Sequence, residues 1–237
     1  MNTIFFDLDG TLLPMDQDKF VEIYFQALAQ KCIPLGFRPE DLIKGIWAGT
    51  RAMIENDGTL KNEERFWDTF SAFFGEDVRK LEPEFEQFYK NEFNLAKEAA
   101  APTPYANECV QILKEKGYKL ILSTNPIFPQ VATYQRMEWA GISPEDFDLI
   151  TTYENSVYCK PNLNYYKDIL NTIGKEAHEC MMVGNDVKED MCTKELGMDT
   201  YLLTDCLISD GESDFSYYKS GNFKDLIKLV KGLPNIL

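Results

Sequence analysis

The sequence predicts an α/β protein, a doubly wound parallel sheet interrupted near its start by a helical insertion. A short apolar run close to the N-terminus ends at two acids, Asp7 and Asp9. A long stretch with helical apolar spacing follows, and after it short apolar strands alternate with amphipathic helices. Such alternation is typical of a parallel sheet with helices on both faces. We therefore expect a core domain of residues 1–15 and 101–237, and an inserted four-helix domain of residues 16–100.

The first predicted strand, Thr3–Leu8, is apolar enough to be buried on both faces. Two acids separated by one residue point the same way if the strand continues. Without a cation Asp7 and Asp9 would repel each other, and hard cations such as Mg²⁺ favour oxygen ligands. This predicts a metal-bound acid pair at the strand's carboxyl end. The alternative is a hairpin turn at Asp9-Gly10, but the segment 11–14 does not lead into an alternating partner strand.

The insertion is predicted to be helical because its apolar residues recur at helical spacing, as in the stretch from Phe20 to Leu28. Its many aromatic side chains are expected mainly to pack between helices, with a minority lining a substrate pocket. The predicted helices are Asp18–Lys31, Pro39–Asn56, Asn62–Gly75 and Glu82–Ala99.

A hinge-like segment, Ala99–Pro104, leads back into the core. Several core helices are predicted to end at a glycine, the residue that most readily adopts the left-handed C-terminal conformation. The expected strands are Tyr118–Ser123, Phe147–Thr151, Glu179–Val183 and Asp199–Leu203. The expected helices are Tyr105–Lys116, Phe128–Ala140, Leu163–Ile173, Lys188–Leu196 and Asn222–Lys231, and Thr204–Ser220 reads as a polar loop.

Composition narrows the function classes. A net charge of −15 and a pI of about 4.5 disfavour binding to nucleic acid or to an anionic membrane. The N-terminus lacks the basic segment of a secretory signal, and no apolar run is long enough to span a bilayer. The six cysteines form no CxxC pair and read as reduced thiols of a cytoplasmic protein, and the single His178 excludes a histidine zinc cluster.

Polar residues follow each predicted core strand where ligands bind in open parallel sheets, outside the carboxyl ends. The second strand ends at Ser123–Asn125, and Lys160 stands in the loop after the third. The fourth ends at Asn185 and Asp186, with Asp190 one turn later. Each group alone is typical of a turn or helix cap. Their convergence on one sheet edge predicts a single site.

These strand ends carry four motifs of a known family. The first, Asp-x-Asp-Gly-Thr, is matched by Asp7–Thr11, and the second, an apolar strand ending in a hydroxyl residue, by LILSTN. We align Thr124 with the family's hydroxyl, with Ser123 as the alternative. The third is Lys160-Pro161, and the fourth lies in 183–190. Over all but the tail, the chain resembles the haloacid dehalogenase-like superfamily, phosphatase type with a helical cap, which implies a Rossmann-like core.

The resemblance implies a role for each motif residue. Asp7 would be the nucleophile and a metal ligand, and Asp9 the general acid and base, with its backbone carbonyl on the metal. Thr124 would hold a phosphoryl oxygen, Lys160 would stabilise charge in the transition state, and Asn125 would help to shape the substrate pocket. The implied cofactor is Mg²⁺.

The fourth motif departs from the family's commonest pattern, because Asn185 stands directly after Gly184, where an acid is often found. We favour Asp186 as the metal ligand, since an anionic oxygen binds Mg²⁺ better than a neutral amide. Asn185 and Asp190 are the alternatives.

The predicted function is a Mg²⁺-dependent phosphatase that hydrolyses a small phosphorylated metabolite through an aspartyl-phosphate on Asp7. Asp9 argues against dehalogenation, because that reaction needs no acid for the leaving group. The alternatives are a phosphomutase, or a non-catalytic ligand-binding or regulatory member. The substrate and the oligomeric state are not predicted.

Overall fold

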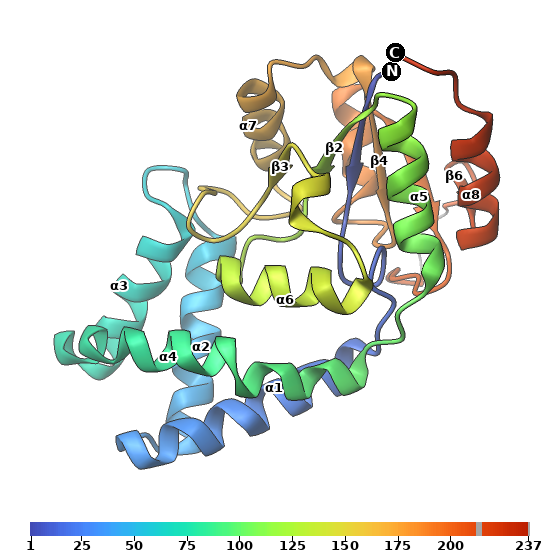
Figure 1. The fold of residues 1–237 in the computed structure, drawn as a ribbon. Coiled ribbons are helices and arrows are strands. Elements are labelled where there is room, and N and C mark those ends of the chain that lie inside the picture. The colour runs from blue at the N-terminus through green and yellow to red at the C-terminus, as the bar shows by residue number, and fades with distance from the viewer. Residues whose placement is uncertain (212–214, 237) are drawn as a thin grey trace.

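The computed structural model describes residues 1–211 and 215–236, and its core is one six-stranded parallel sheet (Figure 1). The strand order is β3-β2-β1-β4-β5-β6. The strands are β1 Thr3–Phe6, β2 Lys119–Leu122, β3 Leu149–Ile150, β4 Cys180–Gly184, β5 Asp199–Leu203 and β6 Lys219–Gly221. Strands β2 and β3 are added on one side of β1, and strands β4, β5 and β6 are then added on its other side. This reversal creates a topological switch point between β1 and β4, where ligands bind in doubly wound sheets.

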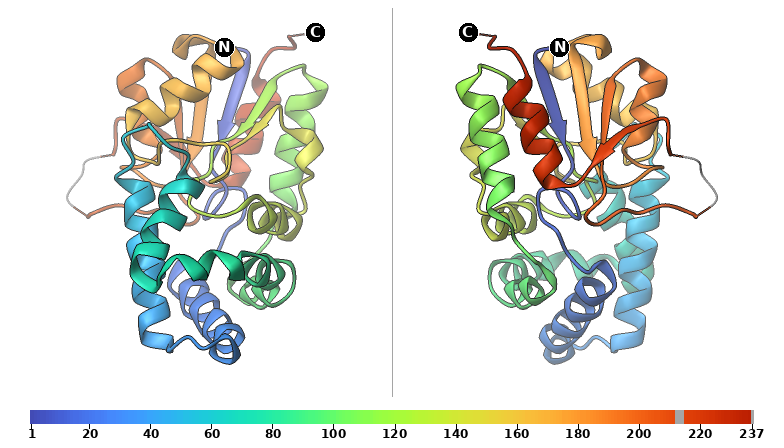
Figure 2. Two further views of the ribbon diagram at one scale, coloured as in Figure 1. Left: turned by 90° about the vertical axis from the view of Figure 1, so that its left-hand side faces the viewer. Right: turned by 90° about the vertical axis from the view of Figure 1, so that its right-hand side faces the viewer.

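The core helices cover both faces of the sheet (Figure 2). They are α5 Pro104–Glu115, α6 Gln130–Ala140, α7 Leu163–Ile173 and α8 Phe223–Gly232. Alternate side chains of β1 enter different clusters, because successive strand residues point to opposite faces. Ile4 and Phe6 pack with residues of α5, α6 and α8, whereas Phe5 packs with α7. The predicted doubly wound parallel sheet is thus confirmed.

Two details of the predicted core are wrong. The predicted helix Lys188–Leu196 is replaced by turns and a short 3₁₀ helix, Met191–Leu196. The Asp186 carboxylate accepts the N–H groups of Lys188 and Glu189, a side-chain turn that competes with a regular first helical turn. The end of the predicted loop Thr204–Ser220 joins β6, which pairs with β5. Residues 212–214 of that loop lie outside the described residues.

The inserted segment lies beyond the carboxyl ends of the strands (Figure 1). Its helices are α1 Gln17–Cys32, α2 Pro39–Ile54, α3 Asn62–Phe74 and α4 Glu82–Lys90, followed by the 3₁₀ helix η3 Glu92–Ala99. The chain enters and leaves side by side, because Asp16 N–H donates to Ala99 O at 3.0 Å and Ala101 N–H to Pro14 O at 2.7 Å. The domain boundaries themselves stay a prediction.

The fourth helix of the insertion was predicted as one element, Glu82–Ala99, and this is wrong. It breaks at Asn91, whose backbone has φ −120° and ψ −79°. The Asn91 side-chain amide donates to Gln87 O at 2.8 Å, so a side chain competes with the backbone ladder at this point.

Aromatic side chains form much of the packing inside the insertion, as predicted. Phe70 is fully buried, with ring centroids 5.4 Å from Phe66 and 4.8 Å from Phe74. Gly49 of α2 permits this approach of α3, since a Cβ at Gly49 would lie 2.5 Å from the Phe66 ring. Among the described residues, no helix is long and apolar enough to cross a membrane.

Candidate active site

The ends of β1, β2 and β4 lie at one level, which brings three of the four motifs together. Phe6 is in register with Leu122 on one side and Val183 on the other. The pairing continues past the strand, because Asp7 N–H donates to Val183 O at 3.0 Å. The first polar residue after each of these strands therefore lies at the same sheet edge.

Asp7 and Lys160 form a buried ion pair at the centre of this edge. Lys160 Nζ lies 2.8 Å from Asp7 Oδ1 and 2.6 Å from Asp190 Oδ1. Its side chain is only 1% exposed. Burial by itself would lower the pKa of Lys160, but the two carboxylates raise it well above its usual value. The lysine is therefore held in its charged form beside Asp7.

Asp190, the last residue of the fourth motif, holds the Lys160 ammonium in place. Its second oxygen, Oδ2, accepts the Asp186 backbone N–H at 3.0 Å. Burial raises the pKa of Asp190 to about 7, and the Lys160 ammonium opposes this rise. Its contacts are those of a residue that positions Lys160.

Asp9 forms an ion pair through Oδ2 with Arg136 Nη1. Arg136 belongs to α6 and is 1% exposed. Its guanidinium lies 4.6 Å from the centroid of the Phe128 ring and donates to Thr133 Oγ1 at 3.3 Å. The other oxygen of Asp9, Oδ1, is buried and has no hydrogen-bond partner within residues 1–211 and 215–236. Burial raises the pKa of Asp9, although Arg136 opposes the rise.

The sequence reasoning missed Arg136. A signal was present, because Thr133, Arg136, Met137 and Ala140 recur at the spacing of one helix face and are otherwise small or apolar. Because buried charges are usually paired, an arginine on the buried face of a helix indicates a nearby anion. In the structure that anion is Asp9.

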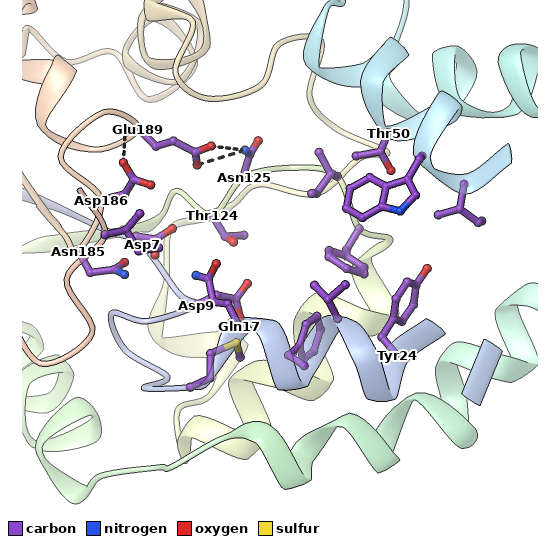
Figure 3. A pocket seen from close by; sticks show the side chains of 18 of the residues that line it. Asp7, Asp9, Gln17, Tyr24, Thr50, Thr124, Asn125, Asn185, Asp186 and Glu189 are labelled. Carbon is purple, nitrogen blue, oxygen red and sulfur yellow. Dashed lines mark hydrogen bonds between the residues drawn. The ribbon is translucent and has the colours of Figure 1, made fainter. Parts of the chain in front are cut away.

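The second motif places Thr124 rather than Ser123 at the cavity (Figure 3). Ser123 Oγ donates to Phe6 O at 3.3 Å and is fully buried. The Thr124 backbone carbonyl accepts from the Thr151 and Tyr165 hydroxyls, both at 2.8 Å. These two bonds fix the turn that points Thr124 toward the acids.

Asn125 links the third and fourth motifs. Its side-chain oxygen accepts the Lys160 backbone N–H at 3.3 Å, and its amide group donates to Glu189, 3.2 Å from Oε2. Glu189 lines the cavity and was missed by the sequence reasoning. Burial raises the pKa of Glu189.

The three candidate metal residues of the fourth motif differ in their contacts. Asn185 Oδ1 lies 2.9 Å from the Thr11 hydroxyl, and its amide group donates to Cys206 O at 2.7 Å. Asp190 forms an ion pair with Lys160 through Oδ1. Asp186 lines the cavity and uses Oδ1 for two backbone N–H groups.

The donors at this edge fit a hard cation, since all of them are oxygens. Of the described residues, no three His, Cys, Asp or Glu side chains gather as a metal-binding group. Mg²⁺ usually takes one or two carboxylates and keeps several waters. The carboxylates of Asp7 and Asp186, together with the Asp9 backbone carbonyl, match this small number of protein ligands. The assignment of ligands among Asp186, Asn185 and Asp190 stays a prediction.

A cavity of about 270 Å³ lies between this acidic edge and the inserted helices. Figure 3 shows Asp7, Thr124 and Asp186 at one end, with Tyr24 and Thr50 of the insertion at the other. The site is therefore assembled from the core, and the insertion forms its opposite wall.

The fold and these strand ends define an α/β protein with an acid-rich site at the switch point of its parallel sheet. The model of the haloacid dehalogenase-like hydrolase family matches residues 1–191. The chain belongs to this family, and it is a hydrolase.

The chain is 28% identical over 233 residues to glyceraldehyde 3-phosphate phosphatase of Methanocaldococcus jannaschii, covering 97% of each chain. Among solved structures, a phosphatase of the family from Thermococcus onnurineus aligns with a TM-score of 0.61 at 18% identity over 100% of both chains. A 2-haloacid dehalogenase from Pseudomonas syringae pv. Tomato aligns with 0.63 at 16% identity over 98% of both. The solved structures support the fold alone, and that fold is shared by proteins of both activities.

Proposed function

We propose that the protein is a Mg²⁺-dependent phosphatase that hydrolyses a small phosphorylated metabolite through an aspartyl-phosphate on Asp7. The observation that carries the proposal is the Lys160 ammonium 2.8 Å from Asp7 Oδ1, beside a cavity that Thr124 also lines. A carboxylate nucleophile must approach an anionic phosphoryl group, and an adjacent fixed cation offsets their repulsion. The similarity to a named phosphatase supports the same reading.

In the first step, the Asp7 carboxylate attacks phosphorus and forms a new P–O bond while the bond to the substrate alcohol breaks. Asp9 donates a proton to the departing alcohol oxygen. Burial raises the pKa of Asp9, against the opposing effect of Arg136, so Asp9 takes up a proton more readily than it would without burial. Lys160 stabilises charge on the transferring group, and Thr124 holds one of its oxygens.

In the second step, water attacks phosphorus of the aspartyl-phosphate, and Asp9 takes a proton from that water. The bond to Asp7 breaks, so inorganic phosphate leaves and the carboxylate is restored. Bound Mg²⁺, which the oxygens of Asp7, Asp186 and the Asp9 carbonyl would hold, would supply positive charge that offsets the repulsion between substrate and carboxylates.

Asp9 also separates the two activities found on this fold. Displacement of halide leaves a stable anion, so a dehalogenase has no use for a proton donor at this position. A second carboxyl beside Asp7 that can donate a proton is useful for an alcohol leaving group, which supports phosphoryl transfer.

The test is phosphate release from a panel of phosphate monoesters, with and without Mg²⁺, by wild type and Asp7→Asn. We expect Mg²⁺-dependent release by wild type and a loss of at least about 10³-fold in Asp7→Asn. Asp199→Asn is the matched control, because Asp199 is exposed at the far end of β5. Activity near wild type in folded Asp7→Asn would refute the nucleophile, and no turnover of any ester would favour a non-catalytic ligand-binding protein.

A further inference from the structure

The positive charges around the cavity are all committed to buried acids. Of the described residues that line it, five are acidic and none is Lys, Arg or His. Lys160 and Arg136 are each 1% exposed, and their ion pairs are with Asp7, Asp190 and Asp9. Any positive charge that Mg²⁺ would supply would lie at the acidic end, where its proposed ligands are. The opposite end therefore offers no partner for a second anionic group of a substrate.

The wall opposite the acids is apolar and largely aromatic. It comes from helices α1, α2 and α3 and from the segment after β2. The side chains that form it are Phe20, Phe25, Ile46, Trp47, Phe66 and Phe128. Trp47 is 52% exposed and its ring centroid lies 5.5 Å from that of Phe25, so a large apolar surface faces the cavity mouth. An exposed apolar surface of this kind in a cavity is typical of a ligand-binding site.

The polar groups among these apolar residues are neutral. The Tyr24 and Tyr89 hydroxyls lie 3.0 Å from each other and satisfy one another. Burial raises the pKa of Tyr89 to about 12 and that of Tyr24 well above its usual value, so both stay uncharged at neutral pH. Gln17 and Thr50 are uncharged as well. This wall can therefore accept a neutral hydrogen-bonding group but cannot neutralise a carboxylate or a second phosphate.

The cavity volume fits a phosphoryl group and one ring. An apolar cavity of about 150 Å³ is enough to hold benzene. The cavity here measures about 270 Å³, which leaves room for a phosphoryl group at the acidic end and a ring-sized alcohol at the apolar end.

We propose that the substrate is a phosphate monoester of an uncharged, apolar and ring-bearing alcohol, with the ring against the wall formed by α1, α2 and α3. This inference rests on the proposed function and names the class of its leaving group. It disfavours substrates with a second anionic group, because that group would be desolvated against the apolar wall with no cation to pair with.

Three esters test the class: benzyl phosphate, 4-carboxybenzyl phosphate and glyceraldehyde 3-phosphate. The first two have the same ring and ester linkage and differ by one negative charge. The third is uncharged outside the phosphoryl group but polar. We expect kcat/KM for benzyl phosphate to exceed that for 4-carboxybenzyl phosphate by about tenfold or more. Glyceraldehyde 3-phosphate should fall between them, because it lacks both the favourable apolar contact and the extra charge.

Thr50 provides the matched variants, because it is half-buried on α2 at the apolar end of the cavity. Thr50→Lys should narrow the preference for benzyl over 4-carboxybenzyl phosphate by about threefold or more, since it adds the missing cation. Thr50→Met adds similar length without charge and should not narrow that ratio.

The outcomes separate this inference from the proposed function. Release of phosphate from all three esters with equal kcat/KM, or a preference for 4-carboxybenzyl phosphate or glyceraldehyde 3-phosphate, overturns the substrate class alone. An unchanged ratio in Thr50→Lys also overturns it, because the carboxylate then does not reach the apolar end. Failure to hydrolyse any ester in the presence of Mg²⁺ overturns the proposed function together with this inference.

Discussion

Arg136 of helix α6 forms an ion pair with Asp9, which lines the cavity in the loop that follows β1. The arginine is fixed from several sides, because it also donates to Ala132 O and Thr133 Oγ1, at 3.3 Å each, and lies over the Phe128 ring. The two acids of the first motif therefore have different cationic partners, Lys160 for Asp7 and Arg136 for Asp9. This difference supports the separate roles that we propose for them.

The first prediction concerns this pair. Arg136→Met should lower kcat/KM for an alkyl phosphate such as benzyl phosphate at least about tenfold more than kcat/KM for 4-nitrophenyl phosphate. An alkoxide needs a proton as it leaves, whereas nitrophenolate leaves readily without one. The kcat/KM values report the first step, in which only the alkyl ester depends on proton donation by a well-placed Asp9. Steady-state kinetics with the two esters measures the difference.

Arg136→Lys is the control for this prediction, since it keeps a positive charge at the same position. It should recover part of the alkyl phosphate activity that Arg136→Met loses. If Arg136→Met lowers kcat/KM equally for both esters, the arginine does not act through proton donation by Asp9.

The arrangement of the core could be predicted from sequence because its signals are local. Gly-ended helices alternate with apolar strands, and the carboxyl ends of parallel strands must meet at one edge. Asp7, Thr124, Lys160 and the fourth motif were therefore predicted to converge, and the structure brings them to that edge. The wrong helix predictions arose where side chains override helical spacing, as Asp186 does after β4 and Asn91 does in the insertion.

Other parts of the site depend on contacts between distant residues. Arg136 pairs with a residue 127 positions away, and Asn125 contacts Glu189 across 64 positions. Periodicity shows that such a helix face is buried but not which strand end it meets. For the same reason, the sequence could not distinguish aromatic residues that pack between helices from those, such as Trp47, that line the cavity.

A second prediction concerns acid stability at the sheet edge opposite the site. Glu179 accepts hydrogen bonds from the Glu176 backbone N–H, Asn2 and Lys175, and these bonds lower the pKa of its carboxyl to about 2. A lowered pKa in the folded state means that the stabilisation is present above the ordinary pKa and is lost as the pH falls toward 2. The free energy of unfolding of wild type should therefore decrease more steeply from about pH 5 to pH 2 than that of Glu179→Gln.

Denaturant unfolding of the two proteins at several pH values measures this difference. Glu195→Gln is the control, because Glu195 is exposed and its carboxyl makes none of these three bonds. Parallel curves for wild type and Glu179→Gln across the acid range would contradict the prediction.

The last prediction concerns Lys160 as a structural element. Lys160→Met leaves Asp7 and Asp190 facing each other without the cation that lies 2.8 Å and 2.6 Å from them. Breaking a buried ion pair by removing one partner costs about 3–5 kcal/mol, so the free energy of unfolding should fall by about that amount. Urea unfolding at neutral pH measures the loss. Lys188→Met, at an exposed position in the same region, should change stability by no more than about 0.5 kcal/mol.

A double variant separates the loss of charge balance from the loss of packing. Lys160→Met combined with Asp190→Asn removes one of the two unpaired carboxylates and should be more stable than Lys160→Met alone. Because the two residues share a contact, their effects should not add. If the double variant is as unstable as the sum of the two single variants, the ion pair is not what the lysine contributes. In that case the cavity left by its side chain accounts for the loss.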